Sequence, residues 1–263
     1  MGCFEVFGGI VVNPDCGSYS DLVPKSRIMS WRTYRITVEL RNLGRRVGAN
    51  RLLGRLVSRC GYETSFQDAI LGATRNGDCA WDIGANVGLY TLQLAQKVGA
   101  KGQVIAFEPD PLNRERLESA VKTQTNVTVQ PFALGDCDAV MQLERGLDSL
   151  GATSRIVFDT KSPATDTILV RVARGDDLVA AAAVPRPNVI KIDTEGFEVD
   201  VLRGLMNVLR SPELRALFIE VHFGLLQERG LHDGPKEVER LIAQAGFRCR
   251  WTDPSHVVAL RAS

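Results

Sequence analysis

The stretch WDIGANVGLY (residues 81–90) places two glycines four positions apart at the end of an apolar run. The run CAWDIG (79–84) predicts a short buried strand, and GLYTLQLAQKVG (88–99) predicts an amphipathic helix directly after it. Glycine tolerates a positive φ and lets other groups come close to the backbone, as the first strand-to-helix turn of a nucleotide site requires. We therefore expect residues 82–88 to form the floor of a nucleotide site.

Strands and helices alternate along the chain after this turn. The pattern predicts strands at 102–109, 127–136, 188–196 and 214–222, helices at 111–124, 198–210 and 235–245, and a closing antiparallel pair at 247–251 and 256–261. Apolar strands that alternate with helices are typical of a parallel sheet covered on both faces. The expected fold is a doubly wound, Rossmann-like α/β sheet.

Residues 137–176 interrupt this alternation. The segments VMQLER (140–145) and TILVRVARG (167–175) alternate apolar and polar residues, which is typical of half-buried antiparallel strands. We expect an inserted β-hairpin here. The stretch GLDSLGATSR (146–155), rich in glycine and serine, predicts a mobile loop between its strands.

The glycine spacing and two acidic residues narrow the class of nucleotide. GxxxG differs from the GxGxxG of dinucleotide sites, and no Lys-Ser or Lys-Thr follows the second glycine, as a P-loop requires. Asp82 suits a cationic ligand, and Glu108, at the end of the second strand, is placed to accept hydrogen bonds from ribose hydroxyls. This combination favours S-adenosylmethionine, whose sulfonium and amino groups are cationic. The alternative is that the glycines serve only to pack the helix against the strand.

Six short motifs occur in an order that resembles the FkbM-family methyltransferases. They are YE (62–63), DIGANVG (82–88), FEPDP (107–111), ALGD (133–136), IKIDTEGFE (190–198) and IEVH (219–222). The resemblance covers residues 60–224, and IKIDTEGFE is its most specific motif. It implies a class I methyltransferase fold and S-adenosylmethionine-dependent O-methylation. It also implies cofactor contacts by Tyr62, Asp82, Gly84, Ala85, Asn86, Gly88, Glu108, Pro109, Ala133, Asp136 and Asp193.

A second group of polar residues carries the candidate chemistry. Asp193 follows one strand, and Glu220 and His222 end the next. Because carboxyl ends of neighbouring parallel strands open on the ligand side, these side chains should meet there. Methyl transfer to oxygen needs an oriented hydroxyl and a group that removes its proton. We expect Asp193 near the methyl donor, Glu220 and His222 beside the acceptor, and His222 or Asp193 as the proton acceptor.

The same residues have other interpretations. Glu195 and Glu198 suit the first turn of a helix, where the dipole favours acids. His222 could be a hydrogen-bonded residue at the end of a strand. The close carboxylates could also hold Mg²⁺ or Ca²⁺ through oxygen ligands. The metal-free version is favoured because a proton acceptor is available without a metal.

Composition sets the remaining expectations. The 263 residues carry a formal net charge of +1, which gives no overall attraction to nucleic acid or membrane. No apolar stretch is long enough to span a bilayer, and six scattered cysteines with no secretory signal are typical of a cytoplasmic protein. Residues 1–58 predict an irregular arm and a basic helical extension that precede the methyltransferase domain at 59–263. The sequence from Lys25 to Arg59 contains ten Lys or Arg residues and a single acid, Glu39.

The function expected is S-adenosylmethionine-dependent O-methylation of a hydroxyl on a small molecule or sugar, without nucleic acid as a partner. The alternatives are an N-methyltransferase, a nicotinamide-dependent oxidoreductase, or a non-catalytic binding module that keeps the fold. The GxxxG spacing disfavours the oxidoreductase. Intact Asp82, Glu108 and Asp193 disfavour the binding module. The sequence specifies neither the acceptor nor the oligomeric state.

Overall fold

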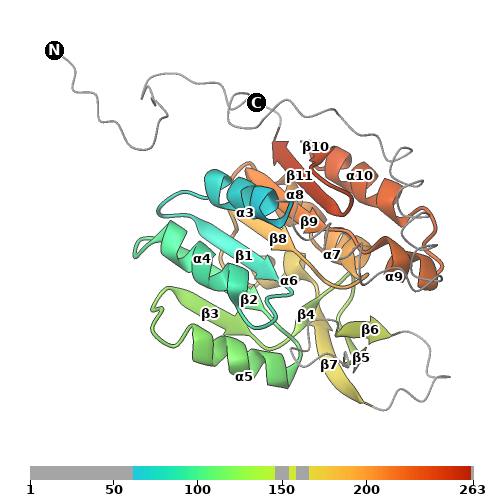
Figure 1. Cartoon of the computed structure of the whole chain (residues 1–263), viewed down its shortest axis with the longest axis horizontal. Coiled ribbons are helices and arrows are strands. Elements are labelled where there is room, and N and C mark those ends of the chain that lie inside the picture. The colour runs from blue at the N-terminus through green and yellow to red at the C-terminus, as the bar shows by residue number, and fades with distance from the viewer. Residues whose placement is uncertain (1–61, 146–153, 158–165, 262–263) are drawn as a thin grey trace, which may run out of the picture.

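The computed structural model describes residues 62–145, 154–157 and 166–261 (Figure 1). The predicted arm and basic extension at 1–58 therefore lie outside the described residues, as does most of the loop expected at 146–155. Within the described residues, none of the helices is long and apolar enough to cross a lipid bilayer.

A seven-stranded sheet forms the centre of the molecule (Figure 1). Its order is β10-β11-β9-β8-β1-β2-β3, and the five strands from β9 to β3 are parallel. The strands are β1 (Cys79–Ile83), β2 (Gln103–Phe107), β3 (Val127–Gln130), β8 (Val189–Ile192), β9 (Ala216–Glu220), β10 (Phe247–Trp251) and β11 (His256–Arg261). The order confirms the predicted doubly wound sheet, and the antiparallel β10–β11 pair confirms the predicted closing pair.

Helices cover both faces of this sheet. Residues of α3 and α4 pack with Ala80 and Val104 on one face, and α5 continues that layer. Residues of α7, α8 and α10 pack with Trp81 and Ile190 on the other face. The helices are α3 (Tyr62–Ala73), α4 (Leu89–Val98), α5 (Pro111–Ala120), α6 (Gly175–Ala180), α7 (Glu198–Gly204), α8 (Met206–Arg210), α9 (Phe223–Glu228) and α10 (Gly234–Gln244). The helix predicted at 198–210 is thus two helices that meet at Leu205.

The insertion is larger than the predicted β-hairpin. It forms a four-stranded sheet in the order β4-β7-β5-β6, which lies at the lower right of Figure 1. Its strands are β4 (Ala133–Leu134), β5 (Ala139–Glu144), β6 (Arg155–Val157) and β7 (Thr167–Ala173). The antiparallel β5–β7 pair is the predicted one. The strand expected at 127–136 is wrong as a single strand, because the chain leaves the main sheet after Gln130 and enters the second sheet at Ala133.

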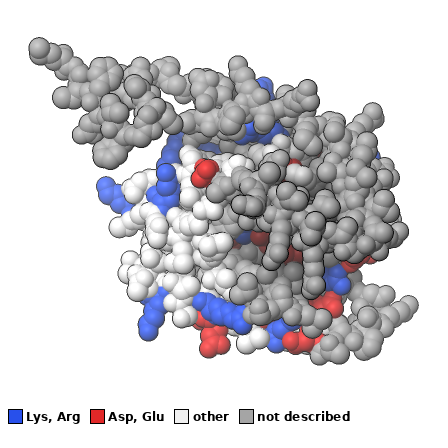
Figure 2. All heavy atoms as spheres, in the orientation of Figure 1, with Lys and Arg blue, Asp and Glu red and all other residues white. Residues whose placement is uncertain are grey.

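The described surface carries both signs of charge, and the described cysteines are unpaired. In Figure 2, basic side chains lie beside acidic ones along the lower edge of the described surface, so this edge carries both signs of charge. Three cysteines fall within the described residues, and all three are free thiols: Cys79, Cys137 and Cys249.

Candidate active site

A pocket lies at the carboxyl ends of β1, β2 and β8, where the direction of strand order reverses. Ligands of doubly wound sheets bind at this switch point. Its wall combines the β1 turn, the end of β2, the segment after β8, and the second sheet. The lining residues are Ile83, Gly84, Asn86, Phe107, Glu108, Pro109, Asn113, Ala133, Leu134, Leu143, Ser154, Ile156, Asp193, Thr194, Glu195 and Phe197.

Gly84 holds the turn after β1 against the segment after β8. Its φ of +77° lies in the left-handed region, and a Cβ atom there would come within 1.8 Å of the Asp193 carbonyl oxygen. The backbone N–H groups of Gly84 and Ala85 both donate to the Phe107 carbonyl, each at 3.1 Å. Gly84 lines the pocket as predicted, but the space that requires a glycine is filled by protein backbone. Gly84 therefore has two roles: it packs against the segment after β8 and it lines the pocket.

Gly88 serves helix packing. It is the N-cap of α4 with a φ of +93°, and a Cβ atom there would lie 2.6 Å from Leu117 Cδ1 of α5. Gly88 is absent from the pocket lining. The packing interpretation of the glycine pair therefore describes Gly88, whereas Gly84 also faces the ligand space.

Glu108 lines the pocket and is fixed by backbone donors. Its Oε2 accepts from Asn86 N at 2.8 Å, and its Oε1 accepts from Asp110 N at 2.9 Å. Burial outweighs these two hydrogen bonds and raises the pKa of Glu108 to about 7. Beside it, Asn86 Oδ1 is buried and has no hydrogen-bond partner among the described residues. The carboxylate of Glu108 and the amide oxygen of Asn86 therefore lie side by side in this part of the pocket.

The sequence predicts that Asp82 contacts a cationic ligand. In the structure, Asp82 is absent from the pocket lining. Its carboxylate is fully buried, accepts from Thr91 Oγ1 at 2.6 Å and lies 3.2 Å from Lys191 Nζ. Lys191 also lies 3.4 Å from Asp193 Oδ2 and donates to the Gly84 carbonyl at 3.3 Å. Burial disfavours its charge, but the carboxylates of Asp82 and Asp193 outweigh burial and raise the pKa of Lys191. Asp82 thus pairs with a buried lysine that the sequence interpretation missed.

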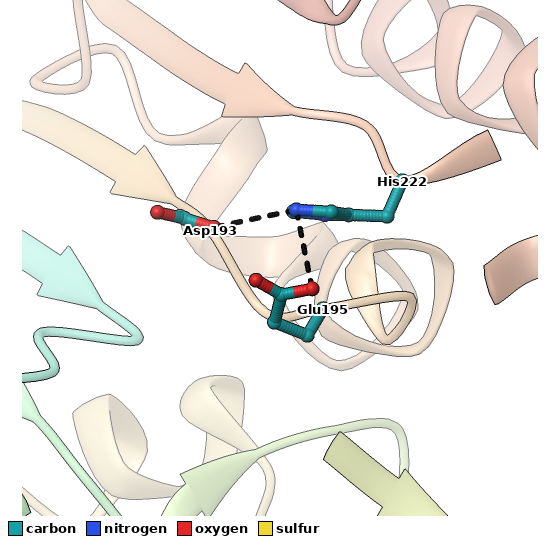
Figure 3. Close-up of side chains that lie close together, drawn as sticks. All are labelled: Asp193, Glu195 and His222. Carbon is teal, nitrogen blue, oxygen red and sulfur yellow. Dashed lines mark ion pairs between the residues drawn. The ribbon is translucent and has the colours of Figure 1, made fainter. Parts of the chain in front are cut away.

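The second group of predicted residues does come together. His222 follows β9, and its Nε2 lies 3.8 Å from Asp193 Oδ1 and 3.5 Å from Glu195 Oε2 (Figure 3). Glu220 Oε1 lies 3.8 Å from the same nitrogen. We call Asp193, Glu195, Glu220 and His222 the acceptor-side cluster. Asp193 and Glu195 from this cluster also line the pocket, so the cluster and the predicted cofactor residues share one space.

Glu198 has a role that its position in a helix concealed. It is fully buried, and its Oε1 accepts from His222 Nδ1 at 2.8 Å and from Gly196 N at 2.8 Å. The sequence pattern assigned it only to the first turn of a helix, which it does occupy in α7. Its contact with His222 was not visible in the sequence because the two residues belong to different elements.

The acceptor-side cluster has unusual protonation equilibria. Burial favours a neutral His222 ring, but Glu198 and the neighbouring carboxylates outweigh burial and raise its pKa to about 10. Burial raises the pKa of Glu195 to about 7 and also raises that of Asp193. The raised pKa favours the imidazolium form of His222 at neutral pH in the ligand-free protein. His222 or Asp193 as the proton acceptor stays a prediction, and the raised pKa of His222 favours Asp193.

The remaining predicted cofactor residues fall on both sides of the pocket wall. Pro109 and Ala133 line the pocket, as predicted. Ala85 and Asp136 are absent from the lining. Tyr62 begins α3, and its side chain lies outside the described part of the chain.

Part of the pocket wall had no signal in the sequence. Leu143 of β5, Ile156 of β6 and Ser154, just before β6, line the pocket from the second sheet. The alternation of β5 predicted a strand but not the direction in which the strand would face.

Comparison with known proteins identifies a family. The family model described as methyltransferase FkbM domain matches residues 82–249. Hexuronic acid methyltransferase AglP of Haloferax volcanii is 29% identical over 177 residues, which cover 67% of this chain and 66% of AglP. Methyltransferase 1 of Beauveria bassiana is 29% identical over 142 residues, which cover 47% of this chain and 57% of that protein. These matches span no more than about two thirds of either relative.

The fold can also be compared with a solved structure named methyltransferase FkbM. Methyltransferase FkbM from Methylobacillus flagellatus superimposes with a TM-score of 0.46 at 17% identity, over 70% of this chain and 43% of that chain.

Proposed function

This chain belongs to the FkbM family of methyltransferases, and on that premise we propose that it transfers the methyl group of S-adenosylmethionine to a hydroxyl of a sugar or similar small molecule. The observation that carries the proposal is one shared pocket. Glu108 and Asn86 line its cofactor side, and Asp193 and Glu195 line its acceptor side. A methyl donor and an acceptor oxygen must meet in such a space for transfer to occur.

The residues of the cofactor side fit S-adenosylmethionine. Glu108 offers a carboxylate to the ribose hydroxyls, and the unpartnered Asn86 Oδ1 offers a second buried acceptor. The carboxylates of Asp193 and Glu195 favour the positive charge of a sulfonium. S-adenosylmethionine supplies an electrophilic methyl group, and its transfer to oxygen leaves S-adenosylhomocysteine and a methylated acceptor.

The acceptor-side cluster provides for the hydroxyl proton. Asp193 has one oxygen 3.4 Å from Lys191 Nζ, while its other oxygen lies on the His222 side. It is thus oriented between two cations and placed at the pocket wall, where it can accept the proton of an acceptor hydroxyl. Its raised pKa strengthens it as a base, because proton transfer is most efficient when the pKa of the base approaches the working pH.

The sugar class of acceptor is supported by a relative. AglP is named a hexuronic acid methyltransferase, and it is 29% identical to this chain over 177 residues. A hexuronic acid presents several hydroxyls and one carboxylate as oxygen nucleophiles. We propose a hydroxyl, because a carboxylate of the acceptor would be repelled by Asp193, Glu195 and Glu220.

Mass spectrometry with methyl-labelled S-adenosylmethionine tests the proposal. The full chain is incubated with a panel of hexoses, hexuronic acids and amino sugars, and products are searched for one added methyl group, a gain of about 14 Da for the unlabelled group. Asp193→Asn serves as the matched inactive variant. An alkali-stable product on a hydroxyl supports the proposal. An alkali-labile methyl ester or an N-methyl product would show that the acceptor atom is a carboxylate oxygen or a nitrogen and not a hydroxyl. Absence of S-adenosylmethionine binding would overturn the whole proposal.

A further inference from the structure

We propose that Asp193, Glu195 and His222 form a binding site for one divalent cation of the Mn²⁺ type at the acceptor side of the pocket. The position of the cation beside the acceptor rests on the proposed function, whereas binding of the cation does not. Each of the three residues offers one ligand atom, and these atoms lie within 4.8 Å of one another. The mixture of carboxylate oxygens and one imidazole nitrogen suits Mn²⁺ among the divalent ions.

The spacing of the side chains is that of ligands around a common centre. His222 Nε2 lies 3.8 Å from Asp193 Oδ1 and 3.5 Å from Glu195 Oε2, and both oxygens face it in Figure 3. These separations are too long for good hydrogen bonds. They match the roughly 3–4 Å between neighbouring ligand atoms that each lie about 2.1 Å from one ion.

The imidazole is oriented for such a role. Glu198 Oε1 accepts from His222 Nδ1 at 2.8 Å, which leaves Nε2 directed at the other two side chains. A histidine that binds a metal usually donates its second ring N–H to a carboxylate or carbonyl, which fixes the ring and strengthens the ligand. Glu198 is fully buried, so this support is shielded from water.

An independent observation is a buried carboxylate oxygen beside the cluster that lacks a hydrogen-bond partner in the described part of the chain. The second oxygen of Glu198, Oε2, is buried and has no hydrogen-bond partner among the described residues. Lys191 is shared between Asp82 and Asp193, and His256 is shared between Asp253 and Glu220. Among the described residues, the ion pairs of Glu195 and Glu198 are with His222 alone. Four carboxylates (Asp193, Glu195, Glu198 and Glu220) therefore surround one imidazole. Of the four carboxylates only Glu198 is fully buried, and a buried carboxylate oxygen without a partner is costly unless a cation offsets its charge.

The site would stay open toward the acceptor. Asp193 and Glu195 line the pocket, so a cation between them would have coordination positions that face the pocket. There it could bind an acceptor hydroxyl and lower the pKa of that hydroxyl. Asp193 would then act as a ligand, and its task as proton acceptor would become unnecessary.

Mn²⁺ binding to the full chain tests the site directly. The protein is treated with chelator, freed of it, and titrated with Mn²⁺ while electron paramagnetic resonance follows the free ion. We expect one saturable Mn²⁺ per chain. Glu195→Gln and His222→Gln should each weaken binding at least tenfold, about 1.4 kcal/mol, and Glu198→Gln should weaken it about 10- to 100-fold. Glu228→Gln is the control, because that carboxylate is 64% exposed and pairs with Arg155 outside the cluster.

Two further measurements separate the outcomes. Wild-type thermal stability should rise with Mn²⁺ concentration, which needs no variant to fold. No saturable binding at millimolar Mn²⁺, or equal binding by wild type, Glu195→Gln and His222→Gln, would overturn the site. Cofactor affinity is measured on the same chelator-treated protein. Methyl transfer at full rate in excess chelator would exclude a role for the cation and leave the proposed function standing. Mn²⁺ binding without cofactor binding would support the cation site and overturn the proposed function.

Discussion

The two sides of the pocket hold their carboxylates in different ways. On the cofactor side, Glu108 accepts hydrogen bonds from the backbone N–H groups of Asn86 and Asp110. On the acceptor side, Asp193 and Glu195 face His222 side chain to side chain. Backbone donors stay in place when neighbouring side chains change. A cluster of ionisable side chains, in contrast, changes its charge and protonation with every substitution, so we expect the acceptor side to be the more adaptable half of the site.

A substitution that forces apart the two backbone segments at Gly84 should have the largest effect. Gly84→Ala would place a Cβ atom 1.8 Å from the Asp193 carbonyl oxygen, so we expect a loss of more than about 4 kcal/mol of unfolding free energy. Gly77→Ala is the matched control, because Gly77 has a φ of +87° but open space around it. It should cost only about 1–2 kcal/mol. Denaturant unfolding compares the two, and equal losses would mean that the close approach is unimportant.

On the acceptor side, the largest expected effect is on turnover. Asp193→Asn removes a base, or in the presence of a cation a ligand, and should lower kcat about 10²–10⁴-fold. Asp177→Asn, at a side chain 61% exposed on α6, should leave kcat unchanged. Steady-state kinetics with whichever acceptor the mass-spectrometric panel identifies gives the values. A kcat within twofold of wild type would place the chemistry elsewhere.

On the cofactor side, the effect should appear in affinity. Glu108→Gln keeps the shape of the side chain but loses a charged acceptor, which is worth about 1.5–3 kcal/mol or roughly a 10- to 150-fold weaker affinity for S-adenosylmethionine. Glu118→Gln on α5, with a side chain 57% exposed, is the control. Calorimetry that shows unchanged affinity in Glu108→Gln would remove this residue from the cofactor site.

The same carboxylate predicts a pH dependence of cofactor binding. Because burial raises the pKa of Glu108 to about 7, the ionised acceptor is present above pH 7 and is lost as the pH falls below it. Affinity should therefore fall by up to about tenfold per pH unit below pH 7. The informative quantity is the difference between wild type and Glu108→Gln, since other groups also titrate. Parallel profiles for the two proteins would contradict the assignment.

The smallest effect concerns stability on the acceptor side. Folding raises the pKa of Glu195 from 4.5 to about 7, so this acid costs stability as the pH rises through that interval, and the full cost is present above pH 7. Glu195→Gln should therefore stabilise the metal-free chain at pH 8 by about 1 kcal/mol, since water at the partly exposed side chain screens much of the cost. The expected rise in Tm is about 2–4 °C. At pH 4 the gain should vanish.

What the sequence predicts follows the same division. Gly84 and Glu108 could be interpreted from the sequence because their partners are backbone groups of adjacent turns, which any chain with this strand pattern supplies. Glu198 could not, because an acid in the first turn of a helix has the same pattern whether exposed or buried against His222. Lys191 was missed for a similar reason, since its partner Asp82 lies on another strand.

The insertion shows that very short strands cannot be predicted from alternation in the sequence. β5 and β7 are long enough for alternation to be visible, with six and seven residues. β4 has two residues and β6 has three, too few to show a period of two. They form because neighbouring strands offer hydrogen-bonding edges, which only the assembled sheet reveals.

The passage of the chain from the main sheet into the second sheet couples ligand binding to local unfolding. Leu143 and Ile156 of the second sheet line the pocket, and Arg145, next to β5, lies 3.0 Å from Asp110 at the start of α5. An opening fluctuation that detaches β5 and β6 would therefore dismantle one wall of the pocket. A ligand that binds only the closed wall must suppress this fluctuation in proportion to its occupancy. Amide hydrogen exchange in β5 and β6 would then record pocket occupancy from residues that carry none of the chemistry.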